Sequence, residues 1–404
     1  MALGIADIVS LIMGLSGFGL QPNPKAPTVD AALQYAMPDA DVVVHIDAVS
    51  FVPNNYKALT QLPELPAIKA SPELAALVTQ AVTQVDAGRK LASAMSGIDV
   101  VDDVADATAF FQIVPNHDPT FVMEVHGKFS TATIDKLATL TGAPPTKIGG
   151  GEMTAKGEQA IGITKDKVLL VGSSQLVKDR LADGWKAPAH TSGVLAGAAE
   201  VIGGKPVFAV VVAMTPSARA YLTPQIANGS AAAADLFTRC KAASFAVYHD
   251  GVGWSWTDSS KDGFDAMVTL SDGMIDLMRA AQVAPRGIAK IALGALESFK
   301  SDPRIADLLK HRDDLLKVVT GFTGDGTFRV KTDKDAKAFK VTIRATGKSV
   351  SEVLPVGLIV PLGVAGAVFA LREGQAVSSP PTMIATPPAK TSPPAKVPAP
   401  APKH

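Results

Sequence analysis

Residues 41–47 (DVVVHID) and 206–213 (PVFAVVVA) decide the fold, because each run of branched apolar residues predicts a buried strand. Each run opens a stretch with the same expected order of elements: strand, helix, paired strands, short helix and hairpin. Asp250-Gly251 carries the strongest short hairpin signal in the chain. We therefore expect an α+β fold of two similar, duplicated domains, with largely antiparallel sheets and helices packed on one face.

The expected domain boundaries follow from composition. Residues 29–185 form the first α+β domain and residues 205–347 the second. Residues 186–204, rich in Ala and Gly, are expected to link them. Residues 264–270 are expected to form a further strand of the second domain.

A long helix is predicted within the first domain. Ser71, Pro72 and Glu73 provide an N-cap, a first-turn proline and a first-turn acid. Apolar residues then recur at helical spacing toward Met95, and Gly97 is the expected stop.

Composition excludes several classes of function. Of 404 residues, 38 are Lys or Arg and 38 are Asp or Glu, so the formal net charge is zero. No basic excess exists to neutralise phosphates, and nucleic acid is not an expected partner. The single cysteine excludes an internal disulfide framework and a thiolate zinc site. No cofactor motif is found, and the triple glycine at 149–151 lacks the lysine spacing of a phosphate loop.

The run VLPVGLIVPLGVAGAVFAL, from Val353 to Leu371, is the expected membrane element. Its 19 residues contain no charge, amide or hydroxyl. As a helix the run would span about 28 Å, close to the hydrocarbon core of a bilayer. We expect a transmembrane helix at 353–371, with the lipid bilayer as its partner. A buried core helix of the preceding domain is the alternative.

The two ends of the chain set the expected topology. Residues 1–28 combine an apolar segment, which predicts a signal or anchor or an amphipathic helix, with a short linker. Residues 372–404 form a Pro/Ala/Lys-rich tail with the composition of a disordered spacer. A protein or the cell wall is a possible partner for this tail. We expect a single-pass or two-pass membrane protein whose body is extracytoplasmic.

Four residues are candidates for chemistry. His45 and Asp47 lie in and just after the first strand, and Glu124 and His126 lie at the end of a later strand. If these side chains converge in a cleft between the domains, they predict a hydrolase or a ligand-modifying enzyme. If they are dispersed over core and surface, a non-enzymatic role is favoured. No G-x-S-x-G nucleophile motif accompanies them.

A second candidate resembles a calcium loop. Asp258, Ser260 and Asp262 place oxygens at positions 1, 3 and 5, and a glycine follows at position 6. Position 12 is Thr269, where such a loop needs a bidentate glutamate. A polar turn is therefore the favoured interpretation, and no metal is expected.

Residues 122–129 and the segment AIGITKDKVLLVGSSQLVKDRL (160–181) resemble uncharacterised bacterial envelope proteins. The resemblance carries no functional motif. The scattered histidines, the missing nucleophile motif, the expected span and the tail instead favour a membrane-anchored, non-enzymatic cell-envelope protein with a scaffold, binding or interaction role.

Overall fold

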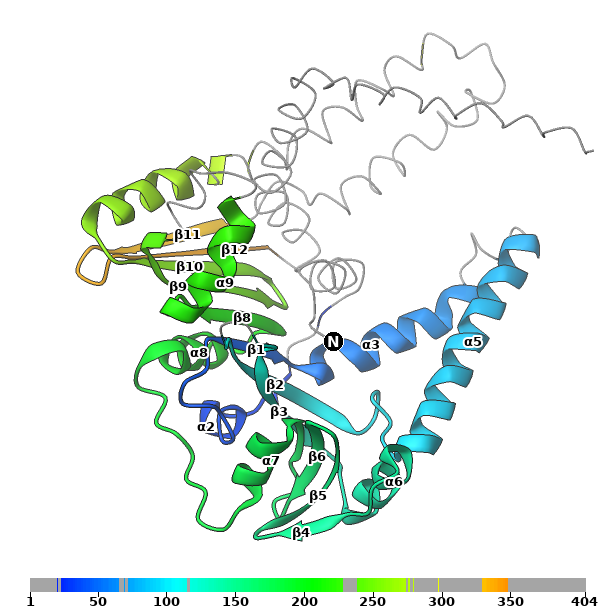
Figure 1. Cartoon of the computed structure of the whole chain (residues 1–404). Coiled ribbons are helices and arrows are strands. Elements are labelled where there is room, and N and C mark those ends of the chain that lie inside the picture. Colours follow the sequence, from blue (N-terminus) through cyan, green and yellow to red (C-terminus); the bar gives the residue numbers. More distant parts are fainter. Residues whose placement is uncertain are drawn as a thin grey trace, which may run out of the picture.

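The computed structural model of the chain describes residues 20, 23–64, 69, 72–114, 117–227, 238–273, 275–276, 279, 297 and 329–347. Twelve strands form one sheet (Figure 1). In chain order they are β1 (Val42–Ile46), β2 (Val104–Gln112), β3 (Thr120–Gly127), β4 (Thr146–Ile148), β5 (Gly151–Lys156), β6 (Gln159–Thr164), β7 (Leu169–Ser173), β8 (Phe208–Ala213), β9 (Cys240–Tyr248), β10 (Gly251–Asp258), β11 (Arg329–Asp335) and β12 (Lys340–Thr346).

The two valine-rich strands lie side by side at the middle of this sheet. Its strand order is β11-β12-β10-β9-β8-β1-β2-β3-β7-β6-β5-β4, and every pairing is antiparallel. In the central pair, Val43 lies opposite Val211. Strands from both halves of the chain therefore share one sheet, and the expected α+β class with antiparallel pairing is confirmed.

The helices whose two ends are described are α2 (Val29–Ala32), α3 (Ala48–Gln61), α5 (Pro72–Ser96), α6 (Thr131–Thr141), α7 (Ser174–Leu181), α8 (Gly193–Gly203) and α9 (Pro216–Ala227), with a short 3-10 helix, η1 (Leu62–Glu64). The long helix predicted from Pro72 is α5, and Gly97 follows it at φ 74°. The positive φ is a conformation that glycine adopts without strain. Residues 193–203, within the expected linker, form α8, which packs on β1, β8 and β9.

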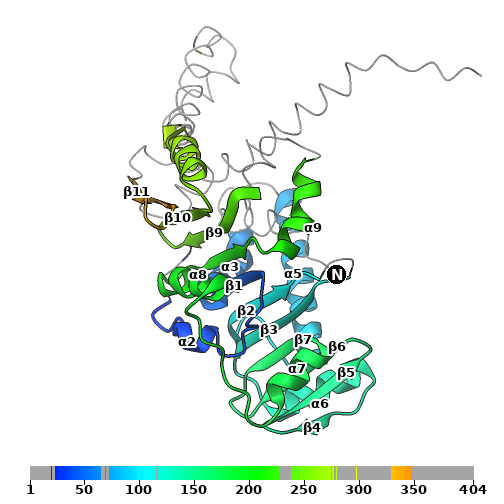
Figure 2. The same cartoon turned by 60° about the vertical axis from the view of Figure 1, so that its left-hand side comes forward.

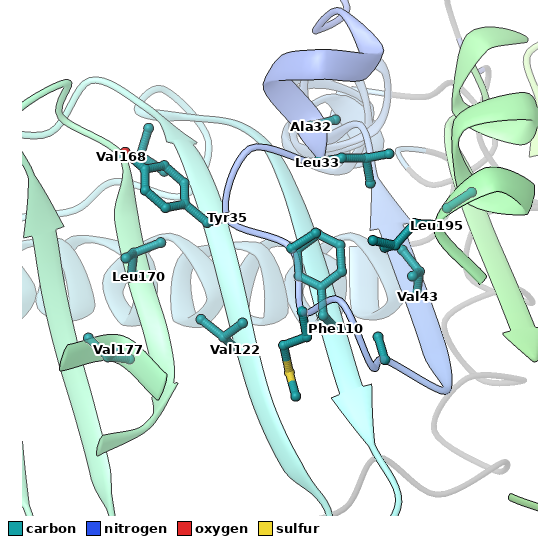
Figure 3. Close-up of a cluster of buried hydrophobic side chains, with 14 of the residues drawn as sticks. Ala32, Leu33, Tyr35, Val43, Phe110, Val122, Val168, Leu170, Val177 and Leu195 are labelled. Carbon is teal, nitrogen blue, oxygen red and sulfur yellow. The ribbon is translucent and has the colours of Figure 1, made fainter. Parts of the chain in front are cut away.

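Helices cover both faces of the sheet, and the expectation of one covered face is wrong. On one face, α2, α7 and α8 pack over Val43, Phe110 and Val122 (Figures 2 and 3). On the other, α6 packs over the side chains that alternate with these, including Val125. The central strands carry apolar side chains in both directions, so each face must be covered.

The predicted strand at 264–270 is also wrong. Residues 261–273 are helical, and Phe264 and Met267 pack with Ile343 of β12. A short apolar run does not distinguish a buried strand from a helix by its period alone. The spacing of Phe264 and Met267 fits one helix face.

Three expected segments lie outside the described residues: most of 1–28, the apolar run 353–371 and the tail 372–404. Among the residues that are described, no helix combines the length and the apolar character needed to cross a bilayer.

Candidate functional site

The strand register brings three of the four candidate residues, His45, Glu124 and His126, onto one face of the sheet, and Asp47 directly follows β1. His45 of β1 lies opposite Thr108 of β2, and Thr108 lies opposite Glu124 of β3. Directly opposed residues in antiparallel strands point to the same side. Asp106 and His126 are the next opposed pair along β2 and β3. Together, His45, Asp47, Asp106, Thr108, Glu124 and His126 form what we call the buried polar row; the first five are buried, and the His126 side chain is 18% exposed.

Two histidines of the row have neighbouring oxygens as partners. His45 Nδ1 lies 2.9 Å from Thr108 Oγ1, and His126 Nδ1 lies 2.8 Å from Asp106 Oδ1. Burial lowers the pKa of His45, although Asp106 and Asp47 oppose the shift. His45 is therefore held neutral. The Nε2 atom of His126 is buried and has no hydrogen-bond partner among the described residues.

Glu124 is the most enclosed acid of the row. Its side chain is fully buried, and burial raises its pKa well above the ordinary value, with a smaller contribution of the same sign from Asp106. Oε2 accepts a hydrogen bond of 2.9 Å from the backbone N–H of Tyr35, whereas Oε1 is buried and finds no partner in the part of the chain that the structure describes. Arg180 of α7 donates to the carbonyl oxygens of Tyr35 and Ala36. Glu124 and Arg180 therefore hold the segment between α2 and β1 from two sides.

Asp47 has a structural task. It is the N-cap of α3, where Oδ1 accepts from the Ser50 N–H at 3.3 Å and Oδ2 from the Ser50 hydroxyl at 2.8 Å. Asn23 Nδ2 also donates to Oδ1 at 2.9 Å. An aspartate in this position satisfies the exposed N–H groups of the first helical turn. Its carboxylate is thus occupied by the chain itself.

The buried polar row offers few groups that could bind a metal or act as a nucleophile. Among the described residues, no group of three His, Cys, Asp or Glu side chains could hold a metal ion. The hydroxyl nearest a histidine belongs to Thr108, whose side chain has no solvent exposure. A nucleophile must meet its substrate, so this hydroxyl cannot act without opening of the sheet. The His126–Asp106 pair with its free Nε2 is the part that most resembles an acid–base device.

The calcium-like residues occupy a helix start. Asp258 has no solvent exposure, and its Oδ1 accepts from the N–H and the hydroxyl of Ser260. Trp256 Nε1 donates to Oδ2 at 3.5 Å. Asp262 lies in the first turn of the helix at 261–273. The Asp258 carboxylate therefore serves the local turn.

A second candidate region is the arm formed by α3 and α5; the helix α5 was predicted, but not a functional role for its surface (Figure 1). The arm is joined by Tyr56 of α3, which donates to Asp86 and lies under the Arg89 guanidinium, 4.4 Å from the ring centroid. Arg89 also binds Asp99 at 2.8 Å. One side of α5 is thus packed against the rest of the protein.

The opposite side of α5 carries large apolar side chains in solvent. Leu77 is 65% exposed, Leu91 62%, Met95 50% and Val85 47%. The outer seam of α5 is the exposed row Leu77, Ala81, Gln84, Gly88, Leu91 and Met95. Its signal is present in the sequence as a spacing of seven, but helical spacing alone does not tell which side of a helix meets the core.

Comparison with known proteins identifies no family. No protein-family model and no curated protein matches the chain. Two crystal structures of TP0453 are remotely similar. Form I has 11% identity and a TM-score of 0.34, covering 84% of this chain and 99% of that one. Form IV has 12% identity and a TM-score of 0.29, covering 60% and 83%. Similarity at this level carries no argument about function.

Proposed function

We propose that the chain is a membrane-anchored, non-enzymatic protein of the cell envelope, which binds a partner through the α3–α5 arm. The observation that carries this proposal is the outer seam of α5, where Leu77, Leu91 and Met95 are at least half exposed. Contiguous exposed apolar side chains are typical of interaction sites. The enclosure of the buried polar row supports the same proposal, because it leaves the row's carboxylates and hydroxyl without access to substrate.

The anchor is the second part of the proposal. The uncharged run at 353–371 spans the bilayer, the body lies on the extracytoplasmic side, and the tail at 372–404 is a spacer or an arm that contacts a protein or the cell wall. Residues 1–28 add either a second span or an amphipathic helix. The end of β12 supports a separate anchor. This strand, the last one described, ends at Thr346, before the apolar run begins at residue 353.

Duplication of one unit is the third part. Outward from the central pair, β1-β2-β3-β7-β6 on one side corresponds to β8-β9-β10-β12-β11 on the other. Each half continues from its central strand to a helix, two paired strands and a further helix. This matching order supports an origin by duplication around a local two-fold axis between β1 and β8.

A hydrolase or ligand-modifying enzyme is the second candidate. It is favoured by two buried atoms on the same sheet face, His126 Nε2 and Glu124 Oε1, which have no hydrogen-bond partner within the described ranges. The test is a panel of ester and peptide substrates with the wild type and His126→Gln. A turnover that His126→Gln abolishes, at unchanged thermal stability, would favour the enzyme.

The proposed arm function is tested with a photo-crosslinking amino acid at Leu91 in cell membranes. Thr83, which is exposed on α5 but off the seam, is the matched control. We expect adducts from position 91 and few or none from position 83. Equal or absent crosslinking at both positions would contradict an interaction role for the seam.

The anchor is tested by alkaline carbonate extraction of membranes. The wild type is expected in the pellet. The double variant Val360→Arg and Val364→Arg is expected in the supernatant, because two arginines at the bilayer centre cost several kcal/mol, roughly 5–7 on insertion scales. A wild type released by carbonate would contradict the anchor.

A further inference from the structure

We propose that the partner of the outer seam is a second copy of this chain, whose α5 pairs with it in antiparallel orientation about a two-fold axis at Asp86. The proposal deepens the interaction role proposed above and rests on it. The alternatives to a second copy are that the bilayer, residues 1–19 or an unrelated protein covers the outer seam.

The first argument is the period of the seam. Leu77, Gln84 and Leu91 recur every seven residues. Ala81, Gly88 and Met95 recur every seven residues between them. This alternating spacing of four and three is the a/d pattern of a coiled coil, and it extends over three heptads. All six positions are exposed, so no other part of the described structure uses the seam.

The second argument is self-complementarity. In an antiparallel pair centred on residue 86, Leu77 meets Met95, Leu91 meets Ala81 and Gln84 meets Gly88 of the other copy. The large side chains Leu91 and Gln84 thus face the small residues Ala81 and Gly88, which is how helix surfaces interdigitate at close range. A parallel pair would instead place Gly88 against Gly88 and leave a void, which is unfavourable.

The middle of the seam is sterically open, and the charged side chains near it lie to one side. A Cβ atom added at Gly88 would meet no atom within 4 Å, so the middle of the seam is open to an incoming side chain. The charged residues of the central part of α5 lie off the seam. Asp86 pairs with Lys90 at 2.7 Å, and Arg89 pairs with Asp99. Pairing along the seam therefore buries no charge, which would be costly.

Charge also distinguishes a second copy from a membrane surface. Helices that lie on anionic bilayers are rich in Lys and Arg on their polar face. On α5 the basic residues are Arg89 and Lys90, and both are paired with aspartates. The exposed residues beside the seam include Thr79, Gln80 and Thr83, which are neutral. This surface suits another neutral helix better than lipid headgroups.

Disulfide trapping of the full-length protein in membranes tests the geometry. Leu77→Cys and Met95→Cys are made singly, given different tags and expressed together. The chain's own cysteine, Cys240, is buried and leaves a low background. We expect a mixed disulfide dimer, because a disulfide needs Cα atoms within about 7 Å. Leu77→Cys alone should not form a disulfide-linked dimer, because the two cysteines would lie about 27 Å apart along the axis. Thr83→Cys is the off-seam control.

A packing variant provides an independent check that does not threaten the fold. Gly88→Leu adds bulk at the closest approach, and should lower the crosslinked fraction of the Leu77/Met95 pair roughly tenfold or more. It should not lower the thermal stability of the dilute monomer, because glycine is a poor helix former and its site is open. Ala87→Leu, exposed and off the seam, is the matched control and should leave crosslinking unchanged.

The outcomes separate this proposal from the one on which it rests. Self-linking of Leu77→Cys, no mixed dimer, or crosslinking unaffected by Gly88→Leu would overturn antiparallel pairing. An adduct from Leu91 to lipid, to residues 1–19 or to another protein would overturn self-pairing while keeping an interaction role. No adduct at all from Leu91 would overturn both.

Discussion

The buried polar row and the outer seam of α5 invert the ordinary distribution of side chains in opposite ways. His45, Thr108 and Glu124 are polar and have at most 2% exposure, whereas Leu77 and Leu91 are apolar and more than 60% exposed. Polar groups are usually buried only with partners, and large apolar groups are usually covered. The row meets this requirement within the chain for most of its atoms. The seam does not, because its large apolar side chains stay exposed to solvent in the part of the chain that the structure describes.

The largest difference between the two regions is expected in the free energy of unfolding when an apolar side chain of each is truncated to alanine. Phe110, adjacent to the row, has no exposure, so Phe110→Ala should lower the free energy of unfolding by about 3–5 kcal/mol. At a protein concentration low enough to keep the chain monomeric, Leu91→Ala should change it by less than about 0.5 kcal/mol. Urea unfolding measures both. Comparable losses would mean that the seam is covered within the monomer.

The second prediction uses the pH dependence of the row on the alkaline side. Because the folded-state pKa of Glu124 is raised by burial, its contribution to stability is complete below the ordinary pKa and is lost as pH rises through the folded value. Glu124→Gln should flatten this loss and be more stable than wild type at alkaline pH. Melting temperatures between pH 5 and 9 measure it, with exposed Glu158→Gln as control. Parallel pH profiles of wild type and Glu124→Gln would contradict a buried neutral acid.

The third prediction concerns the base of the arm. Asp47→Ala removes the N-cap of α3 and should cost about 0.5–2 kcal/mol of unfolding free energy. Asp47→Ser should retain most of it, because serine is also a good N-cap. Urea unfolding of the three proteins measures the difference. If serine does not rescue the loss, the capping role of Asp47 is wrong.

The smallest effect is expected on the acid side of the row. Burial lowers the pKa of His45 in the folded state. The contribution of His45 to stability is therefore complete above the ordinary pKa of histidine, and it is lost as the pH falls toward the lower folded-state pKa. His45→Asn should reduce this acid loss while keeping a polar atom near Thr108. Melting temperatures between pH 4 and 7 measure it. An unchanged acid slope would show that other groups control stability there.

Much of the local structure was predictable. The strands at 41–47 and 206–213, the hairpin at Asp250-Gly251 and the long helix from Pro72 all follow from short-range periodicity and turn residues. The helix at 261–273 was missed because its apolar run fits both periods. The four residues of the candidate site were identified from the sequence, but the residues that form hydrogen bonds with them were not. His45 meets Thr108 63 positions away, and Glu124 meets Tyr35 89 positions away.

By itself, the sequence determined the class of fold, the antiparallel hairpins and the charge balance, because these depend on neighbours within a few residues. Only the tertiary structure decided that both halves join through β1 and β8 into one sheet, that helices cover both faces, and that one side of α5 remains in solvent. The physical reason is that an amphipathic pattern specifies which residues share a face. What covers that face is set by contacts between segments that are far apart in the chain.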